Sequence, residues 1–174
     1  VNDDGDTGSD LAQLDARGHV RVDRKDQTTF SDNLAYNPDT EIAIIPKPAF
    51  LEPREGYFLL GKGTVIVCDE ADQGIRHVAD YFRSQLTTVS GLQLKIVGAK
   101  SAPAKGMIRF VLRDDVAAPA EGYRLTVTQQ AVELEAATPA GLFYGVQTLF
   151  QLLPPQALGT KRISGVRWQI PSLV

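Results

Sequence analysis

The sequence contains few of the residues from which reactive sites are built. It has one cysteine, Cys68, and two histidines, His19 and His77, among its 174 residues. A single cysteine excludes an internal disulfide and any metal site made from several cysteines. The two histidines are far apart in the chain and give little material for a metal centre or for nucleophilic catalysis. We therefore expect no metal and no cofactor.

The sequence also lacks a long apolar run and a strong charge of one sign. Its longest uncharged stretch, 136–160, is interrupted by prolines, glycines and glutamines, so we predict no transmembrane span. The net charge of −3 gives no reason to expect nucleic acid as a partner, because nucleic acids select for clustered lysine and arginine. A chain of this length with 43% hydrophobic residues can form one domain with a real core.

Charge divides the chain into two segments. Residues 1–41 hold ten acidic residues against four basic ones, a balance of −6 that leaves +3 for the remainder. Large apolar residues are sparse in 1–41, so little burial is available to offset the entropy of ordering it. We predict a poorly structured acidic leader or linker over 1–41 and a folded domain over 42–174. The chain begins with valine, so we expect its native start to have been removed.

Two helices follow from the spacing of apolar residues and from capping signals. Apolar residues recur at steps of three and four between Ile75 and Val89, which predicts a helix over about 72–90 that Gly91 caps. Thr138 and Pro139 suit the first turn of a second helix, because threonine caps free amides and proline is tolerated there. The prolines at 154 and 155 end it.

Short apolar or alternating segments predict strands at 42–45, 57–60, 64–68, 92–97, 107–112, 123–128 and 131–136. Segment 64–68 does not alternate between apolar and polar residues, which is typical of a strand buried on both faces. We expect the first helix to join it to a parallel neighbouring strand. The last two segments are close enough for a tight hairpin, and Gly61-Lys62-Gly63 predicts another between 57–60 and 64–68. The predicted fold class is α+β (α/β): a mixed, mainly antiparallel sheet with two helices packed on one face and a polar opposite face.

The two predicted helices differ on their outward sides. The first carries charged residues, whereas the second has no charge between Glu135 and Lys161. Interface cores are poor in charge and keep aromatic and amide groups, while solvent-facing helix sides usually carry charge. We therefore predict that the second helix is sandwiched between its own sheet and another domain, through Tyr144, Gln147, Thr148 and Gln151. The alternative is a solvent-facing side that is simply uncharged.

Several residues with chemical potential have simpler structural explanations. Gly61-Lys62-Gly63 lacks the spacing of a phosphate loop and precedes a strand, so a turn is favoured. The acidic residues at 69, 70 and 72 suit a helix start, and Asp114-Asp115 ends a strand, where aspartate commonly forms turns. No separated carboxylate pair is visible, so no general acid or nucleophile is assigned.

The remaining candidates also favour structural roles. His77 lies off the apolar stripe of its helix, which indicates a solvated histidine, and Cys68 ends an apolar strand and suits a small buried side chain. Trp168 could stack on a sugar, but a lone tryptophan is more often used for packing. Alternation predicts that three arginines face two glutamates on the polar side of the sheet, as cross-strand charge pairs: Arg109, Arg113 and Arg124 with Glu133 and Glu135.

Four segments together resemble the N-terminal domain of glycoside hydrolase family 20 β-N-acetylhexosaminidases. They are IIPKP at 44–48, GYFLL at 56–60, EGYRL at 121–125 and AGLFYGVQTLFQLLP at 140–154. WQIP at 168–171 is similar to the stretch by which that domain passes into the family's (β/α)8 barrel. The resemblance covers 42–174, and the acidic leader has no counterpart in it.

The resemblance implies a non-catalytic N-terminal domain whose helices lie toward a catalytic barrel, which is absent here and expected after residue 174. It implies a longer enzyme that removes terminal β-linked N-acetylglucosamine or N-acetylgalactosamine from glycans with retention, using the substrate's acetamido group as nucleophile. Glycan would contact only that barrel. The family's HxGGDE-type motif is missing, so no residue here inherits a catalytic role. A secreted, periplasmic or cell-envelope location agrees with the family, and the residues themselves assign none.

Two other functions stay open at this point. One is an accessory carbohydrate-binding or interaction module, which requires an aromatic platform on the exposed sheet face. The other is the equivalent domain of a different glycosidase family.

Enzyme assay separates these non-catalytic functions from a catalytic one. We expect the 174-residue chain alone to show no turnover of an aryl N-acetylglucosaminide, because it holds no paired carboxylates in a defined site. The measurement is release of the aryl group over that of a heat-denatured sample. Hydrolysis carried by this chain would contradict the assignment.

Overall fold

The computed structural model describes residues 30–31, 34–37, 42–45, 47–114 and 119–174. Within them, seven strands form one sheet in the order β4-β10-β8-β9-β7-β5-β6. These strands are β4 (Pro53–Leu59), β5 (Val65–Val67), β6 (Lys95–Val97), β7 (Met107–Leu112), β8 (Tyr123–Val127), β9 (Ala131–Ala136) and β10 (Gln169–Leu173). A small sheet has the order β1-β2-β3, with β1 (Phe30–Ser31), β2 (Leu34–Asn37) and β3 (Ile42–Ile44). Short 3₁₀ turns occupy Ala99–Ser101 and Pro155–Leu158.

The larger sheet is mixed, as the sequence predicts. Strand β5 is parallel to β6 and β7, and β7 is parallel to β9. Beyond β9, strands β8, β10 and β4 follow, each antiparallel to its neighbour. The pairings in the described part of this sheet are therefore divided evenly between the two kinds, three and three. The helix that follows β5 connects it to its parallel neighbour β6. The sequence predicts this connection from the uninterrupted apolar segment 64–68.

Helix α1 (Gln73–Ser90) has the caps that the sequence indicates. The Asp72 carboxylate accepts a hydrogen bond from the Ile75 N–H at 3.0 Å. Gly91 adopts the left-handed conformation with φ of 74°, and its N–H donates to the Thr87 carbonyl. The side chain of Arg162 lies directly against Gly91, which brings a positive charge to the negative end of the helix dipole.

Helix α2 (Pro139–Leu152) begins at Thr138, whose hydroxyl accepts from the Gly141 N–H at 3.2 Å. Two glycines of α2 face the sheet at close range. A Cβ at Gly141 would overlap the Gly122 carbonyl oxygen, and one at Gly145 would overlap the Leu134 side chain. The absence of side chains at these positions lets α2 lie close to β8 and β9.

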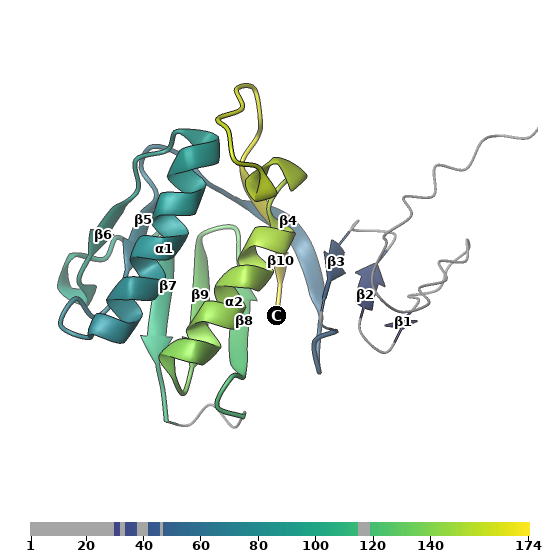
Figure 1. The fold of residues 1–174 in the computed structure, drawn as a ribbon, viewed down its shortest axis with the longest axis horizontal. Helices are drawn as coiled ribbons and strands as arrows, with labels where there is room; N and C mark the ends of the chain where they lie inside the picture. The colour runs from purple at the N-terminus through teal and green to yellow at the C-terminus, as the bar shows by residue number, and fades with distance from the viewer. Residues whose placement is uncertain (1–29, 32–33, 38–41, 46, 115–118) are drawn as a thin grey trace, which may run out of the picture.

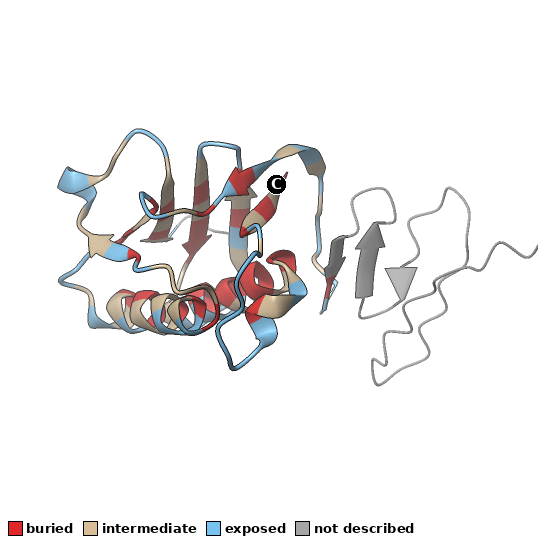
Figure 2. Ribbon diagram, turned by 90° about the horizontal axis from the view of Figure 1, so that it is seen from above, coloured by how far each residue is buried: buried red, intermediate tan, exposed pale blue. Residues whose placement is uncertain are grey.

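The two helices cover one face of the sheet side by side, and the opposite face has no helix over it in the described residues (Figures 1 and 2). Buried residues occur on both helices and along the strands of the larger sheet (Figure 2). The largest that are fully buried come from both layers and, with Ile44, from β3: Phe58, Phe82, Phe110, Ile44, Ile66, Leu86, Ile108, Leu134, Leu142, Leu149 and Ile170. The predicted layer arrangement is confirmed.

The predicted hairpin around Gly61-Lys62-Gly63 is wrong. Strands β4 and β5 lie near opposite ends of the sheet, and β4 pairs with β10, more than a hundred residues later. The glycine segment does form a local turn, in which the Thr64 N–H donates to the Gly61 carbonyl at 3.0 Å. The pairing of β4 with β10 instead follows the burial of their side chains. In the register of these two strands Phe58 lies beside Ile170, and both side chains are fully buried.

The small sheet lies partly inside the segment predicted as a leader. Strands β1 and β2 fall before residue 41, and β2 pairs with β3 in antiparallel register. Regular structure therefore begins before the predicted boundary. The rest of 1–41, and Asp115 of the predicted Asp114-Asp115 turn, lie outside the described residues.

The close approach of α2 can be tested at Gly141. We expect Gly141→Ala to lower the free energy of unfolding by about 1–3 kcal/mol, because the new methyl group meets backbone that cannot rotate away. A gain of up to about 1 kcal/mol in helix propensity offsets part of this loss. Gly63→Ala is the control, since no atom lies within 4 Å of the added Cβ. Equal urea midpoints for the two variants would contradict the close packing.

Candidate functional site

The outward side of the helix layer carries a group of aromatic side chains. Phe143 and Tyr144 on α2 are 40% and 44% exposed. The ring of Tyr81 on α1 lies 5.3 Å from that of Phe143, which lies 6.1 Å from that of Tyr144. Tyr81 also meets Phe150 edge-on at 6.2 Å, so the group continues from the surface into the core. We refer to Tyr81, Phe143 and Tyr144 as the aromatic patch.

Tyr144 was predicted from the sequence as part of an interface, whereas Phe143 and Tyr81 were not. Phe143 lies four residues before Gln147 and therefore on the same side of the helix. Helical spacing could thus have identified Phe143. Tyr81 belongs to the other helix, and its place beside Phe143 depends on how the two helices pack.

Thr148 and Gln147 are more buried in this domain than residues that wait for a partner on the surface would be. Thr148 is 5% exposed, and its hydroxyl forms a hydrogen bond of 2.5 Å with the Tyr123 hydroxyl on β8. Its polar group is therefore already used inside the domain. Gln147 is half-buried, and its Nε2 is buried without a partner among the described residues.

Gln151 binds the backbone of the chain directly after β3. Its Oε1 accepts from the Ile45 N–H at 2.7 Å, and its Nε2 donates to the Ile45 carbonyl at 2.8 Å. The side-chain amide thus binds one residue of backbone as a neighbouring strand would, directly after β3. Ile44 beside it is 2% exposed. Of the four predicted interface residues, Tyr144 is the most exposed, and its ring packs against that of Phe143.

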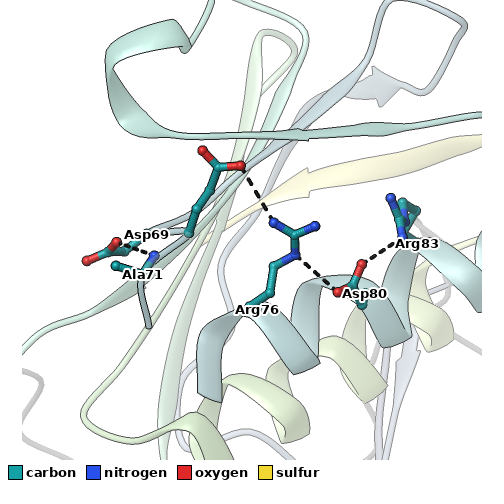
Figure 3. A network of polar contacts seen from close by, with 6 residues as sticks. Asp69, Ala71, Arg76, Asp80 and Arg83 are labelled. Atoms are coloured by element: carbon teal, nitrogen blue, oxygen red, sulfur yellow. Dashed lines mark hydrogen bonds and ion pairs between the residues drawn. The ribbon is translucent and has the colours of Figure 1, made fainter. Parts of the chain in front are cut away.

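The outward side of α1 is charged, in contrast with that of α2. Arg76 Nε donates to Asp80 at 3.1 Å, and Arg83 lies 2.7 Å from the same carboxylate (Figure 3). Arg76 also reaches Glu70, at 3.6 Å. These pairs are partly exposed, so each contributes little to stability. They give α1 the solvated surface that the sequence predicts.

The acidic residues around the start of α1 have structural partners. Asp69 accepts from the Ala71 N–H at 3.0 Å (Figure 3). Glu70 pairs with Arg76, and Asp72 caps α1. Asp114 is exposed. In the part of the chain that the structure describes, no three His, Cys, Asp or Glu residues are grouped so as to hold a metal ion.

Cys68, His77 and Trp168 behave as packing or solvated residues. Cys68 is 2% exposed, and burial raises the pKa of its thiol, which keeps it protonated and unreactive. Nearby Arg76 opposes this shift only in part. His77 is exposed, and Trp168 is buried in the core, where it is unavailable to a sugar.

The open face of the sheet carries paired charges. Arg109 lies opposite Glu133, with 3.9 Å between its Nη1 and the carboxylate. Arg113 and Arg124 both pair with Glu135, the second at 3.5 Å. These are the cross-strand pairs that the alternation predicts.

The described strands of the larger sheet place a single aromatic side chain, Tyr57, on the open face. An aromatic platform for sugar is therefore not assembled on these strands. The described residues also hold no helix with the length and apolar character needed to cross a membrane.

Comparison with known proteins identifies relatives of this fold. The family model described as glycosyl hydrolase family 20, domain 2, matches residues 41–173. A β-N-acetylhexosaminidase of Cellulomonas fimi is 30% identical over 128 residues, which are 73% of this chain and 25% of that protein. The N-acetyl-β-hexosaminidase structure of Streptomyces plicatus is 32% identical with a TM-score of 0.64, over 74% of this chain and 24% of that one.

A third relative gives the same result. The family 20 β-N-acetylhexosaminidase structure of Streptomyces coelicolor A3(2) is 32% identical with a TM-score of 0.63, over 72% of this chain and 24% of that one. The chain thus spans about a quarter of the length of these relatives. The homologous domain is one part of full-length enzymes.

The bond between Gln151 and Ile45 is open to a direct test. We expect Gln151→Ala to lower the free energy of unfolding by about 1–2 kcal/mol and to speed amide hydrogen exchange at Ile45, because two exposed hydrogen bonds are lost. The exposed Gln93→Ala serves as the control and should change stability by less than about 0.5 kcal/mol. Unchanged exchange at Ile45 would show that Gln151 does not hold this strand.

Proposed function

We propose a function from the premise that this chain belongs to glycosyl hydrolase family 20, as that family's domain 2. In a longer β-N-acetylhexosaminidase, this domain packs the outward side of its helix layer against the catalytic barrel that follows Val174. It takes no part in chemistry itself. The relatives of known name are β-N-acetylhexosaminidases, and the chain spans about a quarter of each.

The barrel carries the activity in this proposal. It removes terminal β-linked N-acetylglucosamine or N-acetylgalactosamine from glycans with retention, and the substrate's acetamido group acts as nucleophile. The described residues support a non-catalytic role for the present domain. The carboxylates at 69, 70, 72, 133 and 135 cap a helix, form a turn or pair with arginines, and in the described part of the chain no three His, Cys, Asp or Glu residues are grouped so as to hold a metal ion.

The single observation that carries the docking role is the pair of exposed aromatic residues of the patch, Phe143 and Tyr144, on α2, a helix that holds no charged residue. Exposed aromatic side chains surrounded by uncharged residues are typical of interface cores, where aromatics supply large apolar area at low entropic cost. Phe143 and Tyr144 project from α2, and no charged residue occurs between Glu135 and Lys161. Tyr81 extends the same patch onto α1.

The carbohydrate-binding alternative has less support. It needs several aromatic rings in one plane on the open face, and the described strands offer Tyr57 there, on the edge strand β4, while the charge pairs lie on β7, β8 and β9. Trp168 is buried. The open face is thus a solvated surface with salt bridges, which suits the outside of an enzyme.

The docking role predicts a stability effect that depends on chain length. In the longer polypeptide we expect Tyr144→Ala to lower the free energy of unfolding by about 1.5–3 kcal/mol, because a ring buried against the barrel is lost. In the 174-residue chain the same change should cost less than about 1 kcal/mol, since Tyr144 is 44% exposed there. Thermal and urea unfolding of both lengths give the comparison.

The matched control is Tyr57→Ala, which removes the same ring from the open face, where Tyr57 is 47% exposed. Tyr57→Ala should have the same small effect in both lengths. If Tyr144→Ala costs no more than Tyr57→Ala in the longer polypeptide, the helix layer does not face the barrel.

A further inference from the structure

Five segments of the chain meet at one end of the larger sheet. Strands β5, β6, β7 and β9 are parallel, so the segments that lead into them lie at the same end. The connection between α2 and β10 joins them there, because the Leu60 N–H, just after β4, donates to the Trp168 carbonyl at 2.9 Å. We refer to this end as the basic end, and it consists of residues 61–63, 91–95, 102–106, 128–130 and 153–168.

Backbone hydrogen bonds connect these segments to one another and to the helices. The Val65 N–H donates to the Gly106 carbonyl at 3.1 Å, and the Gly106 N–H donates to the Gln130 carbonyl at 2.7 Å. The Ile163 N–H donates to the Val89 carbonyl, in the last turn of α1, at 2.9 Å. Figure 1 shows the connection between α2 and β10 at the top of the view, above the end of α2. The segments are therefore neighbours in space.

Every charged residue in these five segments is basic. The segments contain no aspartate and no glutamate. The basic residues are all exposed, and none of them forms an ion pair in the part of the chain that the structure describes. The six are Lys62, Lys95, Lys105, Lys161, Arg162 and Arg167.

The opposite end of the domain has the reverse charge. The described residues that follow β5, β6 and β7 or precede β8 include five acidic residues and two basic ones. They are Asp69, Glu70, Asp72, Asp114 and Glu121, against Lys100 and Arg113. The small net charge of the chain therefore conceals a separation of charge along the sheet.

Local structure accounts for two of the six cations. Lys95 begins β6, an edge strand, where lysine discourages pairing with another chain. Arg162 lies against Gly91 at the negative end of the α1 dipole. The other four have no such role among the described residues: Lys62, Lys105, Lys161 and Arg167. Like charges without carboxylates among them repel one another, so a partner of opposite charge is favoured.

Two aliphatic side chains project from the same end. Leu158 is 68% exposed and Ile163 is 41% exposed, on the segment that also carries three of the cations. The five segments contain one aromatic residue, Trp168, which is buried. Single-stranded nucleic acids are bound by stacking on aromatic rings as well as by charge. Cations beside exposed aliphatic groups are instead typical of surfaces that lie on anionic lipid, where the aliphatic groups enter the boundary of the acyl chains.

We infer that the basic end binds the surface of an anionic lipid bilayer. Its cations lie at the headgroups, and Leu158 and Ile163 enter the bilayer interface. Charge complementarity determines the choice of partner, and the exposed aliphatic side chains distinguish a lipid surface from a polyanion in solution. The inference goes beyond the proposed function and does not depend on it. Phe143 and Tyr144 lie in the first half of α2, whereas the basic end follows its last residue.

Vesicle binding tests the contribution of charge. The probes are phosphatidylcholine vesicles with and without about one third phosphatidylglycerol, and cosedimentation measures binding. We expect the chain to bind the anionic vesicles alone, and less tightly as salt rises. Lys161→Glu should weaken binding about 25-fold, because each charge near the surface changes it about fivefold and the reversal alters two. The control Lys100→Glu makes the same change at the opposite end and should weaken binding less than about twofold.

A second pair of variants tests the aliphatic contact. Leu158→Ala should weaken binding to the anionic vesicles at least about fivefold, because apolar area that enters the interface is lost. The matched control is Phe50→Ala, which removes a side chain of similar exposure, 67%, just before β4 at the opposite end. Phe50→Ala should leave binding unchanged. The urea midpoint of each variant shows that the fold is kept.

Equal losses for Lys161→Glu and Lys100→Glu would overturn the inference, and so would the absence of binding to anionic vesicles. Unchanged binding by Leu158→Ala would also overturn it, because charge alone would then explain the contact, and dextran sulfate in solution should compete. The same assay on the longer polypeptide should give the same result. Binding by the 174-residue chain that the longer polypeptide lacks would show that the barrel covers the basic end, which again overturns the inference.

Discussion

The close contact between α2 and the sheet is the constraint on which the rest of the domain depends. Gly141 and Gly145 leave room for the Gly122 carbonyl and the Leu134 side chain, so the helix lies nearer the sheet than a helix with side chains at those positions could. This closeness commits one side of α2 to the core, including Leu142 and Leu149. The same packing turns Phe143 and Tyr144 outward, where they require another partner if they are to be buried.

The elements that depend on local rules could be predicted from the sequence. Asp72 and Gly91 cap α1, and Thr138 caps α2, because capping is decided within one turn of helix. The β8–β9 hairpin and the parallel β5–β6 pair follow from spacing and from the short connecting segments. Core-facing positions on each strand follow from alternation.

Features that depend on distant parts of the chain could not be predicted in this way. The partner of β4 is β10, and nothing local to Gly61-Lys62-Gly63 distinguishes a turn within a hairpin from a turn between strands that separate. Helical spacing places Gln151 and Thr148 on the outward side of α2. In the structure their hydrogen-bond partners are Ile45, directly after β3, and Tyr123 on β8, and spacing within α2 cannot reveal either.

Tyr123 connects the sheet to the helix that carries most of the aromatic patch. Its hydroxyl bonds to Thr148 on α2, whose other side carries Phe143 and Tyr144. This bond fixes the middle of α2 against β8. A helix already held in place loses less entropy when a partner covers its outward side. The contact that holds α2 on the sheet therefore also favours the docking that we propose for its outward side.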